Sequence, residues 1–241
     1  MNIVIPLAGK DPRFVDMPKA LVDVCGKLFI AHILKQLRIE PEDRLIFVVL
    51  EEDVKKFNID ETLKNVTGKR AIIRVLPRAT QGSPCSILEA ARDLIDNETD
   101  LLIELGDVLR DVGNLYQDIA DRRSEVSGII PVERRDMTGR LFGYVRADEE
   151  GFAEALLEKE ATYVAPWATM GLYYFSRGKD FVWAAEEMIR KRSFVHNDMF
   201  FVGPVYNELV KRGDKVILSQ NTVKAVLGSP EEVEAFHKQC V

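Results

Sequence analysis

Residues 1–30, MNIVIPLAGKDPRFVDMPKALVDVCGKLFI, contain the stretch that decides the fold. The short apolar segment 3–5 runs into a loop that contains Gly9, Arg13 and Lys19, and an apolar helical pattern follows. A basic, glycine-containing loop between a strand and a helix is a place where phosphate can bind, because backbone N–H groups and the helix N-terminus favour an anion. The loop has the spacing of neither a Walker motif nor the dinucleotide fingerprint, so it does not identify the ligand alone.

Strand and helix patterns alternate through the first half of the chain. Residues 45–50 are a continuous apolar run, which is typical of a strand buried on both faces of a sheet. Residues 71–76 and 101–105 predict two further strands, and Ser83-Pro84 between them predicts the N-cap and first turn of a helix. This β-α-β-α-β order predicts a parallel sheet with helices on both faces.

The second half has a mixed pattern. Residues 143–146 and 152–157 flank an acidic turn at Gly151, which predicts a hairpin. Ser229 to Glu232 form a capping-box pattern with proline at the first helical position, so they predict the start of the last helix. Further strands are expected at 128–132, 170–175 and 216–218, and further helices at 181–189 and 202–210.

These elements predict an α/β fold, a Rossmann-like three-layer α/β/α arrangement with a mostly parallel mixed sheet and a smaller hairpin subdomain. No Pro/Gly/Ser-rich linker or internal repeat divides the sequence, so we expect one domain over residues 1–241. Within it, residues 1–125 are expected to form a nucleotide-binding half and residues 126–241 an acceptor-binding half.

The composition excludes several classes of protein. The chain is 46% hydrophobic, but it contains no apolar run long enough to span a membrane. Its first residues lack the pattern of a secretion signal, so we do not expect secretion. Its net charge of −6 gives no general attraction for nucleic acid. The cysteines, three in number and scattered, argue against a disulfide framework and fit a reducing compartment. We therefore expect a cytoplasmic protein without a membrane or nucleic-acid partner.

Polar residues follow the predicted strands where ligands of open parallel sheets bind. Arg13 and Lys19 follow the first strand, Gln81 and Gly82 precede the Ser83 helix, and Asp107 comes directly after the strand at 101–105. A carboxylate at the end of a buried strand can hold Mg²⁺ together with phosphates, although an aspartate that starts a turn is the alternative reading of Asp107.

Several motifs occur in a fixed order along the chain. They are Ile3-Val4-Ile5-Pro6-Leu7-Ala8-Gly9, Arg13-Phe14, Pro18-Lys19-Ala20-Leu21, Gln81-Gly82, Gly106-Asp107, Phe142-Gly143-Tyr144-Val145, Glu158-Lys159, Met170-Gly171-Leu172-Tyr173-Tyr174-Phe175, the segment 197–207 and the segment 228–232. In this order they resemble the sugar-phosphate nucleotidylyltransferase family, specifically its branch for capsular and surface polysaccharide synthesis. The resemblance covers nearly the whole chain and implies a nucleotide-diphospho-sugar transferase-like fold.

The resemblance implies transfer of an NMP, from CTP or UTP, to a sugar phosphate with release of pyrophosphate, and a homodimer is possible. It assigns catalytic roles to Arg13, Lys19 and Lys159. It assigns nucleotide contacts to Leu7, Ala8, Gly9, Lys10, Gln81, Gly82 and Gly106. It assigns acceptor contacts to Gly143, Glu158, Met170, Gly171 and Asn197. It assigns Mg²⁺ as the cofactor, with Asp107 as its ligand and Asp198 as the candidate for a second one.

Two departures from the family pattern keep alternatives open. Asp11 and Pro12 replace a glycine and a hydroxyl residue of the family's loop, and Val226 stands where many members have a second metal-binding aspartate. These changes favour a nucleotide-binding module with little turnover as one alternative. A second is a cytidylyltransferase for a small phospho-metabolite such as choline phosphate or a phosphorylated amino acid. A related glycosyltransferase is less compatible, because the sequence after Asp107 lacks the second carboxylate of an Asp-x-Asp motif.

Overall fold

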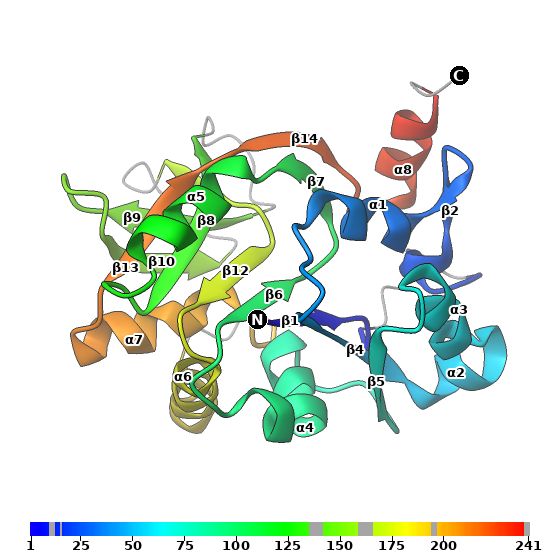
Figure 1. The fold of residues 1–241 in the computed structure, drawn as a ribbon, viewed down its shortest axis with the longest axis horizontal. Coiled ribbons are helices and arrows are strands. Elements are labelled where there is room, and N and C mark those ends of the chain that lie inside the picture. Colours follow the sequence, from blue (N-terminus) through cyan, green and yellow to red (C-terminus); the bar gives the residue numbers. More distant parts are fainter. Residues whose placement is uncertain (10–12, 15, 135–141, 159–165, 194–196, 239–241) are drawn as a thin grey trace.

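The computed structural model describes residues 1–9, 13–14, 16–134, 142–158, 166–193 and 197–238. A ten-stranded mixed sheet has the order β10-β9-β11-β8-β12-β6-β1-β4-β5, with β13 beside β8, and two short sheets pair β14 with β7 and β2 with β3 (Figure 1). The strands are β1 (Asn2–Pro6), β2 (Asp23–Val24), β3 (Lys27–Leu28), β4 (Arg44–Leu50), β5 (Ala71–Leu76), β6 (Leu101–Glu104), β7 (Val108–Asp111), β8 (Gly128–Arg134), β9 (Gly143–Ala147), β10 (Ala153–Glu158), β11 (Trp167–Thr169), β12 (Leu172–Phe175), β13 (Val216–Gln220) and β14 (Thr222–Val226). The helices are η1 (Lys19–Leu21), α1 (Phe29–Gln36), α2 (Glu51–Phe57), α3 (Ile59–Val66), α4 (Ser83–Ile95), α5 (Gly113–Arg122), α6 (Gly178–Lys191), η2 (Gly203–Val205), α7 (Tyr206–Arg212) and α8 (Pro230–His237).

The centre of the sheet is parallel and buried on both faces. Strands β5, β4, β1 and β6 are neighbours that run in the same direction. Along β1, Val4 packs into one hydrophobic cluster, whereas Ile3 and Ile5 pack into another. The same alternation holds along β4, where Phe47 and Val48 belong to different clusters. Two cores on opposite faces explain why these strands are continuous apolar runs.

Helices cover both faces and make three layers. Helices α4, α6 and α7 lie on one side of the sheet in Figure 1 and supply Ile87, Phe181 and Leu209 to the first cluster. Helices α1 and α5 lie on the other side and supply Ile33 and Leu115 to the second. The predicted α/β fold with flanking helices and a mixed sheet is confirmed.

The antiparallel strands extend the same sheet. Strand β12 pairs antiparallel with β6 and also with β8, so elements from both halves of the chain share one sheet. The predicted hairpin is present as β9 and β10, with Asp148 accepting hydrogen bonds from the N–H groups of Glu150 and Phe152 in its turn. The capping box at Ser229 and Glu232 is also present.

Local details differ from the predictions. The expected strand at 170–175 begins only at Leu172, as β12, because Gly171 has a φ of +71° and separates β12 from the short strand β11. Gly82, and not Ser83, is the N-cap of α4, and no described side chain caps this helix. The unpredicted elements are strands β2, β3, β7, β11 and β14 and helices α2, α3 and α5.

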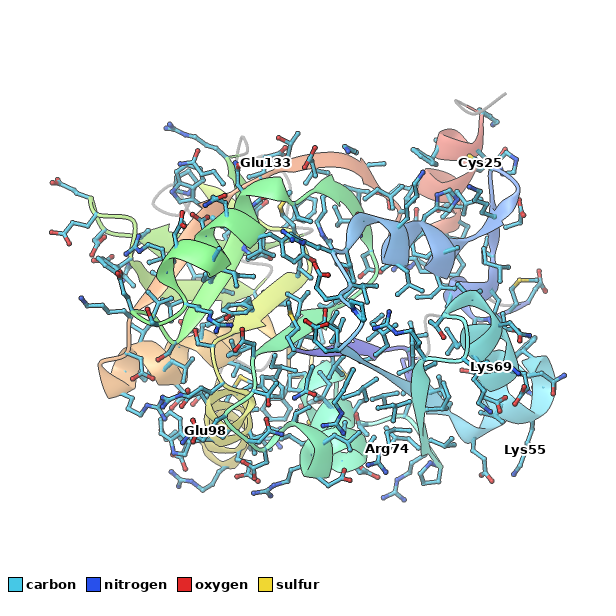
Figure 2. The ribbon with its side chains drawn as sticks, in the orientation of Figure 1. Cys25, Lys55, Lys69, Arg74, Glu98 and Glu133 are labelled. Atoms are coloured by element: carbon cyan, nitrogen blue, oxygen red, sulfur yellow. The ribbon has the colours of Figure 1, made fainter. Side chains whose placement is uncertain are left out.

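Two of the cysteines are in the described part of the chain. Cys85 is a free thiol, but Cys25, in the turn between β2 and β3 beside α8, is disulfide-bonded (Figure 2). The sequence argued against a disulfide framework, and the disulfide at Cys25 departs from that expectation. No helix in the described ranges has both the length and the apolar character needed to cross a membrane.

Candidate active site

One edge of the sheet gathers most of the sequence-predicted site residues. The carboxyl ends of parallel β1, β5 and β6 meet at this edge, and antiparallel β12 begins there with Leu172 opposite Glu104. The segments Leu7 to Gly9, Gln81-Gly82, Gly106-Asp107 and Met170-Gly171 therefore all border this edge, which we call the carboxyl edge.

The loop after β1 begins as an extension of the sheet. The N–H of Leu7 donates to the carbonyl of Val48 at 2.7 Å, and Ala8 is 1% exposed. Gly9 is exposed, and a Cβ placed on it would meet no described atom within 4 Å, so its backbone can be approached by a ligand. Arg13 is exposed. Lys10 lies outside the described residues.

Lys19 and Asp107 form the ion pair of this edge. The Nζ of Lys19 lies 2.5 Å from Oδ1 of Asp107. This ion pair connects the start of η1 to the turn after β6. The Lys19 ammonium also lies over the rings of Phe14 and Phe29, 5.7 and 4.9 Å from their centroids. The Lys19 side chain is 15% exposed and that of Asp107 56%, so the carboxylate remains accessible to a further cation.

The Gln81-Gly82 segment contacts the acceptor half of the chain. The N–H of Phe200 donates to the carbonyl of Gln81 at 2.8 Å. Gly82 has a φ of +115°, and a Cβ there would lie 2.0 Å from the carbonyl oxygen of Phe200. Only glycine fits this close approach of two backbones. The Gln81 side chain is exposed and the Phe200 ring is buried, so Gln81 is the accessible member of the contact.

The turn after β6 brings Asp107 next to the start of β12. Gly106 takes a φ of +76°, and its N–H donates to Oε1 of Glu104 at 2.7 Å. The N–H of Leu105 donates to the carbonyl of Gly171 at 2.9 Å, so the nucleotide side and the acceptor side of the predicted site share a backbone hydrogen bond.

Sequence reasoning missed a buried ion pair behind this turn. Nη2 of Arg110 contacts Oε2 of Glu104, and both side chains are 0% exposed. Nη1 of Arg110 donates to the carbonyl of Met170. Burial raises the pKa of Glu104, while Arg110 and the Gly106 N–H oppose that rise. The signal available in the sequence was a glutamate ending the apolar run of β6 and an arginine six residues later.

On the acceptor side, Gly143 faces a polar group of residues. It lies opposite Glu158 in the β9–β10 register, and a Cβ on Gly143 would lie 2.9 Å from Oε2 of Glu158 and 3.1 Å from Oγ1 of Thr169. Tyr173 donates its hydroxyl to Thr169 at 3.2 Å, and burial raises its pKa. Lys159, predicted to bind the incoming phosphate, lies outside the described residues.

The two predicted metal ligands differ in their surroundings. Asp198 is 87% exposed, and its Oδ1 lies 3.5 Å from Nη2 of Arg192. The neighbouring Asn197 is exposed as well. Val226 pairs with Val108, the residue after Asp107, so an apolar side chain lies where the sequence resemblance predicts a second aspartate in many relatives. Within the described ranges, no three His, Cys, Asp or Glu side chains gather to hold a metal.

Known proteins share this architecture. The nucleoside-diphosphate-sugar pyrophosphorylase from Vibrio cholerae RC9 superimposes with a TM-score of 0.82 at 20% identity, over 98% of this chain and all (100%) of that one. UDP-glucose pyrophosphorylase in complex with UDP-glucose superimposes with a TM-score of 0.76 at 17% identity, over 99% of this chain and 97% of that one. At these identities the likeness establishes the fold.

Sequence comparison gives evidence on the family of the chain in addition to its fold. The bifunctional protein GlmU of Cupriavidus taiwanensis is 29% identical over 164 residues, which are 67% of this chain and 34% of that protein. The chain thus spans about a third of the length of this curated relative. The model of a family described as nucleotidyl transferase matches residues 14–198, which include Lys19, Gln81, Gly106 and Asp107. The chain belongs to the nucleotidyl transferase family.

Proposed function

We propose that the chain transfers an NMP from a pyrimidine NTP to a sugar phosphate and releases pyrophosphate, in surface polysaccharide synthesis. The observation that carries the proposal is the Lys19–Asp107 pair, with 2.5 Å between Nζ and Oδ1, at the same carboxyl edge as the open backbone of Gly9. This arrangement offers a cation for phosphate and a carboxylate for a divalent metal at one point. Family membership and the match to GlmU support the same reaction class.

Asp107 fits a Mg²⁺ ion that is held by one carboxylate and by substrate phosphates, because its side chain is 56% exposed. When bound there, Mg²⁺ supplies neutralisation of the charge on the phosphates. Lys19 then exchanges the Asp107 carboxylate for the α-phosphate and stabilises the charge that develops on it. Arg13 binds the β- and γ-phosphates.

The acceptor phosphate attacks the α-phosphorus in line, so the protein acts mainly by positioning the two substrates. Gly9, Gln81 and Gly106 border the nucleotide. On the acceptor side, Glu158, Gly171 and Asn197 face the ligand, and the buried Gly143 and Met170 lie behind them. Lys159 binds the incoming phosphate. A structural neighbour, UDP-glucose pyrophosphorylase, is known in complex with UDP-glucose. This ligand supports the proposal that the substrates are a pyrimidine nucleotide and a sugar phosphate.

The test is pyrophosphate release with CTP, UTP, dTTP, ATP and GTP in the presence of Mg²⁺. Each NTP is combined with a panel of sugar 1-phosphates, choline phosphate and phosphorylated amino acids. Turnover with a pyrimidine NTP and a sugar phosphate is the expected result, and loss of turnover with EDTA tests the metal. Turnover with choline phosphate or a phospho-amino acid instead contradicts the sugar assignment. Tight NTP binding without turnover identifies a binding module.

A further inference from the structure

We infer that the buried pair Glu104–Arg110 is the positioning device of this site: it fixes the Gly106-Asp107 turn relative to the Met170-Gly171 segment. Glu104 ends β6 and Arg110 lies in β7, and neither side chain has been given a role in the proposed reaction. The inference rests on the proposed function, because it concerns the relative placement of a nucleotide and an acceptor.

On the nucleotide side, Glu104 uses both carboxylate oxygens. Oε1 accepts the N–H of Gly106 at 2.7 Å, and Oε2 accepts Nη2 of Arg110. Gly106 is in the left-handed region at φ +76°, and this turn aims Asp107 at Lys19. The orientation of Asp107 therefore depends on the hydrogen bond that the Gly106 N–H donates to a buried, charged acceptor.

On the acceptor side, Nη1 of Arg110 donates a hydrogen bond to the carbonyl of Met170. Met170 is fully buried, at 0% exposure. The backbone of Arg110 is held by α1, since the Arg110 N–H donates to Oε1 of Gln36 at 2.9 Å. Nε2 of Gln36 donates in turn to the carbonyl of Val108 at 3.2 Å. The Arg110 backbone is thus held in place, and its guanidinium connects the segment between β11 and β12 to Glu104 at the end of β6.

The energetics favour a positioning role over a stabilising one. Removing two charges from water costs several kcal/mol per ion, and apolar pairs of similar size are often equally or more stable. Among the described residues, Nε of Arg110 has no hydrogen-bond partner, which adds to the cost. An apolar pair, however, cannot supply both a hydrogen-bond acceptor for the Gly106 N–H and a donor for the Met170 carbonyl.

The experiment replaces the pair by apolar residues in Glu104→Leu/Arg110→Met and compares it with Arg177→Gln/Asp180→Asn. The control changes an ion pair at the opposite end of β6, where Nε of Arg177 lies 2.6 Å from Oδ2 of Asp180. Pyrophosphate-release kinetics, the thermal midpoint and amide hydrogen exchange of peptides covering 105–109 and 170–173 are measured for each protein.

We expect the apolar variant to keep its thermal midpoint, to lose about 10- to 100-fold in kcat, as for lost supporting hydrogen bonds elsewhere, and to exchange faster in both peptides. The control is expected to keep kcat and the exchange of both peptides. Arg110→Lys keeps the charge but lacks the planar guanidinium fork that binds Glu104 and Met170 together, so it should give an intermediate kcat. It replaces the double variant if that variant does not fold.

Unchanged kcat, KM and exchange in the apolar variant overturn the inference. So does a loss of activity that only follows a loss of folded protein. If the wild-type chain never releases pyrophosphate, the proposed function fails separately. In that case the exchange of peptides 105–109 and 170–173 still decides whether the pair fixes these two segments.

Discussion

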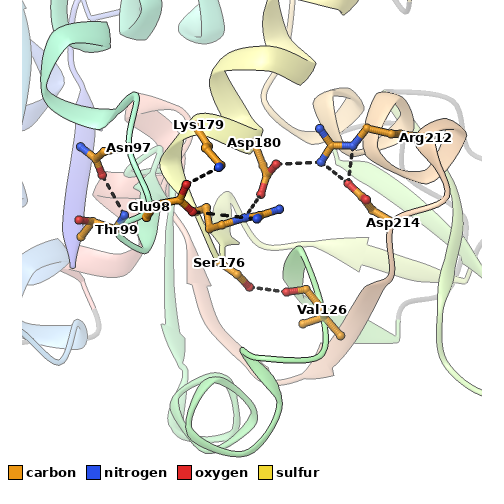
Figure 3. Close-up of polar contacts among 10 residues, drawn as sticks. Asn97, Glu98, Thr99, Val126, Ser176, Lys179, Asp180, Arg212 and Asp214 are labelled. Carbon is orange, nitrogen blue, oxygen red and sulfur yellow. Dashed lines mark hydrogen bonds and ion pairs between the residues drawn. The ribbon is translucent and has the colours of Figure 1, made fainter.

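Strand β6 has an ion-paired cluster at each end, and the two clusters differ in what they bind. At the carboxyl end, Glu104 and Arg110 are both 0% exposed, and they hold the backbone of Gly106 and Met170. At the amino end, a larger network joins the turn before β6 to α6 and α7 (Figure 3). This amino-end network consists of Glu98, Arg177, Lys179, Asp180, Arg212 and Asp214.

The amino-end network is made of side chains that bind other side chains. Asp180 is its buried centre at 4% exposure, and Arg177 and Arg212, which lie 2.6 and 2.8 Å from its two oxygens, are 43% and 32% exposed. Water can replace either arginine, because both are partly exposed, whereas Asp180 is buried. Ion pairs at the amino end therefore stabilise the packing of helices, whereas the pair at the carboxyl end orients backbone groups of the site.

The largest effect should come from the carboxyl edge itself. Lys19→Ala and Asp107→Ala each remove one charge from the phosphate site, and we expect kcat to fall on the order of 10²–10³-fold. Stability should change little in Asp107→Ala, because the Asp107 side chain is 56% exposed. Pyrophosphate release and urea unfolding measure the two quantities.

Asp111→Asn is the matched control, since Asp111 ends β7 and its exposed side chain lies 3.6 Å from Lys224. It should retain wild-type kcat. Near-wild-type activity of both alanine variants would show that the ion pair is not part of the reacting site.

The opposite result is expected at the amino end. Asp180→Ala removes the acceptor of two arginines, and we expect the free energy of unfolding to fall by about 2 kcal/mol, the usual range for hydrogen bonds to charged groups. The kcat should stay unchanged, because no residue of the carboxyl edge contacts Asp180 in the described structure. A variant with normal stability and reduced kcat would contradict the division of roles between the two ends.

The strand pattern made much of the fold predictable. Apolar runs such as 45–50 identify strands buried on both faces, and strand ends then predict which loops meet. The contact of Lys19 with Asp107, 88 residues apart, follows from that topology. The residues that support the site were harder to predict from the sequence. Glu104 and Arg110 form a buried ion pair, and their burial depends on β7, a strand that the sequence did not predict.

The break at Gly171 shows a second limit. Residues 170–175 have a uniform strand composition. The carbonyls of Met170 and Gly171, however, accept hydrogen bonds from the Arg110 side chain and the Leu105 N–H, and not from the backbone of a neighbouring strand in a β-ladder. Such a break is set by tertiary contacts, which a local pattern does not contain. The disulfide state of Cys25 was missed for a similar reason, since spacing along the chain does not report distance in the fold.

A smaller effect should follow from Glu98→Gln. Glu98 is 70% exposed and pairs with Lys179 at the surface, so we expect a loss of less than about 1 kcal/mol in the free energy of unfolding. Salt should shrink even this difference, because exposed charges are screened. Urea unfolding at about 0.05 M and 0.5 M NaCl measures it. A loss as large as that of Asp180→Ala would mean that the rim of the amino-end network is as important as its centre.

The smallest effect belongs to the far end of α6 and depends on pH. Hydrogen bonds from Arg190 and then Lys191 lower the pKa of Glu187 to about 2, below its ordinary value. A carboxyl group with a lowered pKa stabilises the fold above its unfolded-state pKa of about 4.3, and this contribution is lost as the pH falls toward 2. Glu187→Gln should therefore be slightly less stable than the wild type at pH 7, and the difference between their urea midpoints should narrow from pH 5 downward. A difference that stays constant with pH would show that Glu187 stabilises α6 through packing and not through its charge.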